Sequence, residues 1–281
     1  MRIKHICFYK RSGASKKSDI FERVGNGAVN MWQHVCAVSA FTADVFRAIK
    51  NTLIRRSVTR RIDLWVEIDK AGIRAVPIVA LISFMIGVII AFVGHMQLKT
   101  FGAEIYVAAL VAIATVRIIG AIMTGIIMAG RTGASYAAEI GAMRVNEEID
   151  AIKTMGISPT EFLVVPRVLA LSITMPILTI ISDIVAIFGG MCVALMIMNV
   201  SIMEYWNTTM DWLTFNNFAI GVLHGWLFGW VIAISGCWCG MQARKTSDGI
   251  GRATTRAVVA GIIGCIVVTA ILTVIFNWID I

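Results

Sequence analysis

Residues 75–94 read AVPIVALISFMIGVIIAFVG and contain no charged side chain. A helix of about 20 apolar residues is long enough to cross the hydrocarbon core of a bilayer. The composition agrees, because 58% of the chain is hydrophobic and 15% is charged, against about 45–50% and about 25% in soluble domains. Further apolar runs lie at 105–129, 168–203, 218–243 and 257–279. The sequence therefore predicts an all-α integral membrane protein with five transmembrane helices.

These runs set the expected domain boundaries. Residues 1–50 are expected to form a basic N-terminal cytoplasmic segment, and residues 51–281 the membrane domain. The run that starts at residue 168 contains Pro176 and is expected to form one long, bent or tilted helix. The five spans are predicted at about 73–98, 104–129, 168–200, 217–241 and 257–279.

The distribution of positive charge predicts the orientation of the spans. Most of the 25 Lys and Arg residues precede the first span, and others lie in the 130–167 and 240–256 loops, whereas the 204–217 loop has none. Cytoplasmic loops retain Lys and Arg. We therefore expect a cytoplasmic N-terminus and, after five crossings, a C-terminus on the outer side. The net charge of +8 then reflects topology and the lipid surface, with no nucleic-acid partner.

The region before the first span has two parts. Residues 1–18 are basic and contain no acid before Asp19, which is typical of a disordered arm or of an organelle transit sequence. Residues 53–70 place apolar side chains at helical spacing among arginines, and residues 29–49 show a weaker version. This pattern predicts amphipathic helices in the membrane interface, and two soluble helices packed on each other are the alternative.

Two charged side chains fall inside predicted spans. Arg117 lies in the second span and Asp183 in the third, where insertion of a charge costs about 2.5–3.5 kcal/mol. Neither is expected to face lipid, so they form either a buried pair or part of a transport path. In the fourth span, Gly221, Gly225 and Gly229 repeat every four residues and allow close packing, either within the chain or between subunits.

Residues 129–156 form the long polar interruption between spans two and three. Val145, Ile149 and Ile152 share one side of a helix from 145 to 155, which Asn146 is expected to cap and Gly156 to end. Three glycines, Gly130, Gly133 and Gly141, are expected to break up a preceding helical piece that carries Glu139. A short cytoplasmic helix of this kind favours mechanical contact with a soluble partner, and an ordinary ordered loop is the alternative.

Four motifs resemble one known family. They are AGRTGAS at 129–135, AEIGAMRV at 138–145, VPR at 165–167 and GIGRATTRAVV at 249–259. They closely resemble the MlaE/YrbE-type permease family, the membrane subunits of ABC transporters that work with MCE-domain proteins on phospholipids and other lipids. The sequence departs from the family at 117–121, which read RIIGA where family members usually carry Arg-Glu-Leu-Gly-Pro. A role of that glutamate cannot be carried over, and the head-group preference stays open.

The resemblance implies a homodimer of five-span subunits in a cell inner membrane, with a periplasmic C-terminus; an organelle membrane is the alternative location. The short helix between spans two and three would seat on a separate ATPase that binds ATP and Mg. Phospholipid would occupy a cavity between the subunits, with Ile86 and Ile126 among its lining residues, below an MCE-domain protein. The residues expected to couple the ATPase to the spans are Glu139, Arg144, Glu147, Glu148, Asp150, Lys153 and Gly156.

Other functional classes have less support. An ion-coupled secondary carrier would use Arg117 and Asp183, but the chain shows no inverted repeat or paired broken helices. A scaffold that moves no lipid is the third possibility, and lipid movement would distinguish it. His and Cys residues lack metal-ligand spacing, and no nucleophile, base and orienting group can be assembled. Because no phosphate-binding GxxxxGK[ST] loop occurs, we expect no cofactor and no ATP hydrolysis in this chain.

Overall fold

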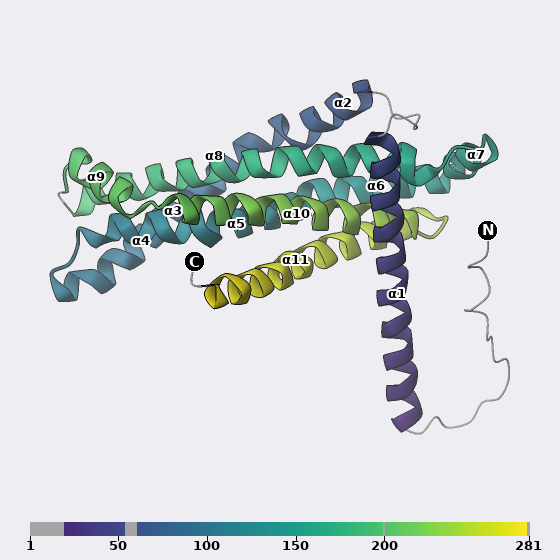
Figure 1. Ribbon diagram of the computed structural model, residues 1–281, viewed down its shortest axis with the longest axis horizontal. Helices are drawn as coiled ribbons and strands as arrows, with labels where there is room; N and C mark the ends of the chain where they lie inside the picture. The colour runs from purple at the N-terminus through teal and green to yellow at the C-terminus, as the bar shows by residue number, and fades with distance from the viewer. Residues whose placement is uncertain (1–19, 54–60, 199, 280–281) are drawn as a thin grey trace. The chain divides into compact units, whose positions relative to one another are not determined.

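The computed structural model describes residues 20–53, 61–198 and 200–279, and every regular element in these ranges is a helix (Figure 1). The chain divides into two units, residues 1–42 and residues 43–281. Helix α1 (Ile20–Leu53) crosses this division. In the first unit, Trp32 and Val35 of α1 are 70% and 56% exposed. An interfacial location for this helix remains a prediction.

The second unit contains the membrane-spanning helices. Five helical segments are long and apolar enough to cross a membrane, which confirms the predicted all-α fold with five spans. The principal single helices are α3 (Val76–Leu98), α8 (Val165–Ile197), α10 (Phe215–Met241) and α11 (Ser247–Trp278). Helix α8 is one continuous helix with Pro176 inside it, as its sequence predicts.

The second span is longer than expected. It runs through α4 (Tyr106–Ala114), η3 (Thr115–Ile119), α5 (Gly120–Met128), η4 (Ala129–Gly133) and α6 (Ala134–Val145). These 40 residues would measure about 60 Å as a helix, twice the hydrocarbon thickness of about 30 Å. The helix therefore extends beyond the membrane. The expectation that Gly130, Gly133 and Gly141 interrupt it was wrong, because η4 is a π-helical turn that keeps the chain helical.

Two shorter helices flank the spans. Helix α2 (Arg61–Ala71) packs on α8 and exposes Ile62 and Trp65, which are 73% and 69% exposed. The start of the amphipathic helix predicted from residue 53 lies partly outside the described residues. Helix α9 (Ile202–Trp212) follows α8 where the sequence predicted a loop. The sequence feature that marks the start of this helix is Ser201, an N-cap residue. Its hydroxyl accepts a hydrogen bond from the Glu204 backbone N–H at 3.2 Å.

The glycine series of α10 packs within the chain. A side chain at Gly221 would collide with the Val116 carbonyl in η3. A β-carbon at Gly229 would lie 2.7 Å from the Leu171 carbonyl oxygen of α8, closer than van der Waals contact. The sequence left packing within the chain and packing between subunits as alternatives. At these glycines the packing is within the chain, because the backbone of α10 lies close to the backbones of α8 and of the second span.

Candidate functional site

The segment between spans two and three lies at one end of the bundle, opposite α9 (Figure 1). Helix α6 ends at Val145, and the short helix α7 (Glu148–Thr154) follows after a turn. Ile149 is 4% exposed and anchors α7 to the bundle. Gly156 follows with φ +77°, a left-handed conformation that suits glycine and ends the segment, as predicted.

The predicted start of this helix was wrong. Asn146 lies at the end of α6, and its side-chain amide donates to the Glu148 carboxylate at 3.0 Å instead of capping α7. Glu147 occupies the N-cap position with φ +60°, a left-handed conformation that is uncommon for residues other than glycine. The turn between α6 and α7 therefore needs contacts from elsewhere to hold it, because such a conformation is unfavourable alone.

Those contacts come from the loop between α10 and α11. The Lys245 ammonium donates to the Glu147 carboxylate at 2.9 Å and to the Asp150 carboxylate at 3.1 Å. Lys153 also donates to Asp150, at 3.3 Å. The hydrogen bonds from Lys245 and Lys153 lower the pKa of Asp150, and those to Glu147 and Asp150 raise the pKa of Lys245. We call this arrangement the Lys245 clasp.

The clasp joins two loops that are 95 or more residues apart in the sequence. Its groups are exposed, so each ion pair is screened and contributes little to stability. Its consequence is geometric, because the two loops present one surface. On that surface Glu148 and Lys153 are exposed, and Met155 is 66% exposed. We call Glu148, Lys153 and Met155 the α7 surface.

Two residues grouped with the coupling segment lie apart from this surface. Arg144 is half-buried in the last turn of α6. Glu139 lies in the middle of α6, where the Arg167 guanidinium donates to its carboxylate at 2.9 Å. Arg167 is 4% exposed and also donates to the Leu163 carbonyl at 3.0 Å. Its Nε lies 3.9 Å from the carboxylate of Glu67, which is 8% exposed.

This Arg167 cluster joins three helices, because Glu67 belongs to α2, Glu139 to α6 and Arg167 to α8. The Arg167 guanidinium also lies over the Tyr136 ring, 5.5 Å from its centre. No role was predicted for Arg167 or Glu67 from the sequence. The VPR motif at 165–167 was the available signal, but the motif alone names no partner for the arginine.

Arg117 and Asp183 do not form a buried pair, which was one of the two alternatives that the sequence left open. Arg117 lies in the π-helical turn η3 and donates to the Asn217 side-chain carbonyl of α10 at 3.1 Å. Asp183 is 3% exposed and faces Gly120 of α5, and neither of its carboxylate oxygens has a hydrogen-bond partner within the described part of the chain. A role in a transport path remains a prediction for both residues. Ile86 and Ile126 are half-buried on α3 and α5, and a lipid cavity lined by them also remains a prediction.

The isolation of Asp183 makes a testable prediction. A buried carboxylate without a partner is costly, and Asp183→Asn keeps the shape while it removes the ionisable group. We expect the free energy of unfolding in detergent either to increase or to decrease by no more than about 1 kcal/mol. Breaking a buried ion pair would instead lower it by about 3–5 kcal/mol. Thermal unfolding of the purified variant measures this difference. A loss of several kcal/mol would show that Asp183 has a charged partner.

Comparisons with known proteins agree with the motifs. The family model described as Permease MlaE matches residues 64–275. A probable ABC transporter permease protein of Rickettsia conorii is 34% identical over 259 residues, which cover 92% of this chain and 98% of that protein. The intermembrane phospholipid transport system permease protein MlaE of Haemophilus influenzae is 30% identical over 192 residues, which cover 67% of this chain and 72% of that protein. This chain therefore belongs to the MlaE permease family.

Proposed function

We propose that this permease is the membrane subunit of an ABC transporter that moves phospholipid or a related lipid between the inner membrane and an MCE-domain protein. Family membership supports the permease role, and the Haemophilus influenzae relative is named for intermembrane phospholipid transport. The observation that carries the proposal is the α7 surface, which the Lys245 clasp fixes at one end of the bundle. That surface gives a soluble ATPase a defined place to act on the spans.

The energy comes from this ATPase partner, which binds ATP and Mg. Glu148, Lys153 and Met155 offer an acid, a base and an apolar side chain within one short helix and its end. Met155 is 66% exposed at the end of this helix, and an exposed methionine can anchor in an apolar pocket of a partner. Motion of the ATPase is then transmitted through α6 and the Lys245 clasp to the second, fourth and fifth spans.

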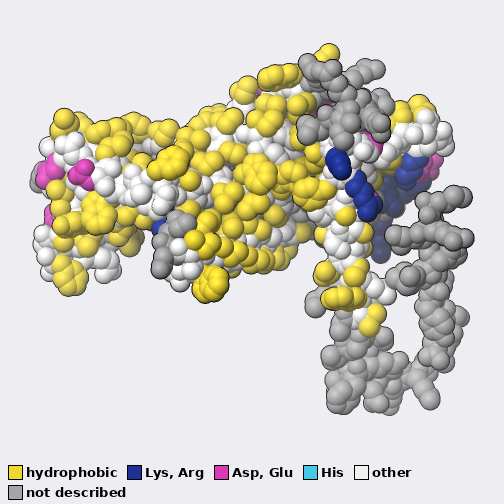
Figure 2. All heavy atoms as spheres, viewed as in Figure 1, with side chains coloured by type: hydrophobic (Ala, Val, Ile, Leu, Met, Phe, Trp, Pro, Cys, Tyr) yellow, Lys and Arg dark blue, Asp and Glu magenta, His cyan; other side chains and the backbone are white. Residues whose placement is uncertain are grey.

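The orientation follows from charge. Arg244, Lys245 and Arg252 lie at the α7 end of the bundle, whereas Glu204 and Asp211 belong to α9 at the opposite end. Figure 2 shows acidic side chains at both ends of the visible face, accompanied by Lys and Arg at the α7 end but not at the α9 end. Because cytoplasmic segments retain Lys and Arg, this charge distribution supports a cytoplasmic α7 end and a periplasmic C-terminus. The MCE-domain protein then meets the α9 side.

A second copy of the chain completes the transport path. Helix α11 is highly apolar, and only 17% of its most apolar stretch is buried within one chain. Ile263, Ile271 and Val274 are 55%, 54% and 70% exposed. In a homodimer, part of this surface faces the partner and part faces lipid. The lipid cavity between the subunits is expected to be lined from the first, second and fifth spans, including Ile86 and Ile126.

The test is purification of the tagged chain in mild detergent, followed by identification of its partners and reconstitution in vesicles. We expect an ATPase and an MCE-domain protein to co-purify, ATP hydrolysis only when the ATPase is present, and ATP-dependent transfer of labelled phospholipid. Photo-crosslinkers at Ile86 and Ile126 should capture phospholipid in the assembled complex. Nucleotide turnover by the pure chain, or retention of the partners without lipid movement, would contradict the proposal.

A further inference from the structure

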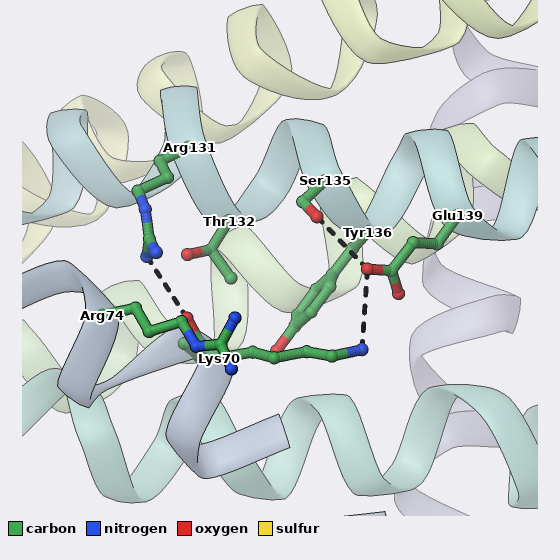
Figure 3. A pocket seen from close by; sticks show the side chains of 8 residues that line it. Lys70, Arg74, Arg131, Thr132, Ser135, Tyr136 and Glu139 are labelled. Carbon is green, nitrogen blue, oxygen red and sulfur yellow. Dashed lines mark hydrogen bonds and ion pairs between the residues drawn. The ribbon is translucent and has the colours of Figure 1, made fainter. Parts of the chain in front are cut away.

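A polar cavity lies between α2 and the second span, away from the α7 surface. Its volume is about 290 Å³ (Figure 3). Helix α2 and the turn after it supply one wall, and η4 and α6 supply the other. We call it the α2–α6 pocket. It is lined by Lys70, Ala71, Arg74, Arg131, Thr132, Ser135, Tyr136 and Glu139.

Positive charge exceeds negative charge in this lining, which contains three bases and one acid. The acid, Glu139, already accepts hydrogen bonds from Arg167 at 2.9 Å and from Ser135 at 3.3 Å. Arg74 pairs with Asp69 at 3.1 Å, and Lys70 lies 3.9 Å from Glu139. The bases on the α2 side are therefore partly neutralised by neighbouring carboxylates.

Arg131 is different. It forms no ion pair within the described residues, and its guanidinium donates to the Lys70 backbone carbonyl at 3.3 Å. A guanidinium has five N–H donors in a planar fork that fits the oxygens of a phosphate. Arg131 also lies in the π-helical turn η4, and such turns occur frequently at functional sites. Its charge and most of its donors are thus available to a ligand.

Hydroxyl groups lie among these bases. Tyr136 is 2% exposed, and Figure 3 shows its ring extending from α6 toward Lys70. Its hydroxyl lies near Glu67 without a hydrogen bond of good geometry to it or to any other described residue. Thr132 is 4% exposed, and its hydroxyl makes a long contact of 3.8 Å to the Met128 sulfur. A ligand with several acceptor oxygens would satisfy these buried donors.

The surroundings of the pocket are those of a membrane interface. Ile73, which lies between two lining residues in the sequence, is 67% exposed, and Leu81 on α3 is 65% exposed. Trp65 on α2 is 69% exposed, and tryptophan is enriched at the level of lipid head groups. The polar pocket therefore adjoins an apolar surface that acyl chains can cover.

We propose that the α2–α6 pocket binds the phosphate of an anionic phospholipid in the leaflet on the α7 side of the membrane. Arg131 and Arg74 hold the phosphate oxygens, and the acyl chains lie along α3 outside the bundle. The cavity has room for a head group but not for a whole lipid. This lipid is separate from transported lipid and joins α2 to the second span, so the inference requires only that the chain lies in a membrane.

The experiment measures binding of phosphatidylglycerol to the purified full-length chain in detergent by native mass spectrometry and by the shift in unfolding temperature. The test variant is the double substitution Arg74→Gln and Arg131→Gln. The matched control is Arg252→Gln with Arg256→Gln, which removes the same charge from α11. We expect the control to bind as the native chain does, and the test variant to bind about tenfold or more weakly, because it loses two charge-assisted contacts.

Two further arms separate the possible outcomes. Arg131→Lys keeps the charge and loses the fork, so its affinity is expected to lie between those of the native chain and the double variant; it also serves if the double variant does not fold. Inorganic phosphate should stabilise the native chain far less than phosphatidylglycerol does. Equal stabilisation by inorganic phosphate would identify a free-phosphate site and overturn the lipid assignment. Native-like lipid binding by both Arg131 variants would overturn the site itself.

Discussion

Arg167→Met is expected to lower the free energy of unfolding by about 3–5 kcal/mol, because it removes the buried counter-charge of Glu67 and of the partly exposed Glu139. The Arg167 side chain is 5% exposed, and the Glu67 side chain is 11% exposed. Arg167 makes the 2.9 Å contact to Glu139 and the hydrogen bond to the Leu163 carbonyl. Methionine fills much of the same volume, so most of the loss arises from charge rather than from a cavity.

Thermal unfolding and denaturant-induced unfolding of the purified chain in detergent measure this effect. Arg252→Met is the matched control, because Arg252 pairs with Asp248 at 3.0 Å on the surface with side chains 62% and 72% exposed. A surface pair of this kind contributes about 0–1 kcal/mol. If the two substitutions destabilise equally, the cluster has no special role.

A rescue variant distinguishes charge from packing. Glu67→Gln and Glu139→Gln, added to Arg167→Met, remove both carboxylates that lose the Arg167 counter-charge. We expect the triple variant to recover a large part of the lost stability, because replacing all members of a buried ionic cluster is far less costly than removing one. No recovery would indicate that the lost hydrogen bond to Leu163 and the contact with the Tyr136 ring account for the loss.

The spans were predictable because their physical cause is local. A run of apolar residues such as 75–94 has one stable location, and length alone decides whether it crosses a bilayer. The same reasoning gave the single long helix α8 despite Pro176, because no polar segment divides the run. The family resemblance could also be predicted, since its motifs are contiguous in sequence. These features depend on neighbouring residues only.

The contacts of the candidate site were not predictable in this way. Lys245 and Glu147 lie 98 residues apart in the sequence, and no periodicity links them. The 145–155 pattern correctly separated buried Ile149 from exposed acids, but it could not show that α6 continues the second span or that Glu147 adopts φ +60°. A pair of Arg117 with Asp183 was considered because both are charges inside apolar spans. Their neighbours depend on helix rotation, which packing determines.

Glu147→Lys together with Glu148→Lys is expected to weaken binding of the ATPase by about tenfold or more, because like charges then meet where the native acids are accommodated. The double reversal also places a lysine against Lys245 and opens the clasp. The measurements are the affinity of the ATPase for the purified chain and ATP-dependent lipid transfer by the reconstituted complex. Glu204→Lys with Asp211→Lys on α9 is the matched control for ATPase affinity, since it makes the same charge change at the opposite end of the bundle.

A charge swap then separates the two causes. The variant Glu147→Lys, Asp150→Lys, Lys245→Glu inverts the Lys245 clasp and keeps Glu148 and Met155 unchanged on the α7 surface. If the clasp acts by fixing the geometry of α7, this variant should recover most of the affinity and the lipid transfer, because opposite charges again meet across the two loops. If the ATPase instead contacts the acidic side chains directly, the swap variant should not recover the affinity. In that case Glu148→Lys alone should already weaken ATPase binding. Native binding and transfer by the original double reversal would show that α7 is not the coupling element, and would direct the search to the 240–256 loop.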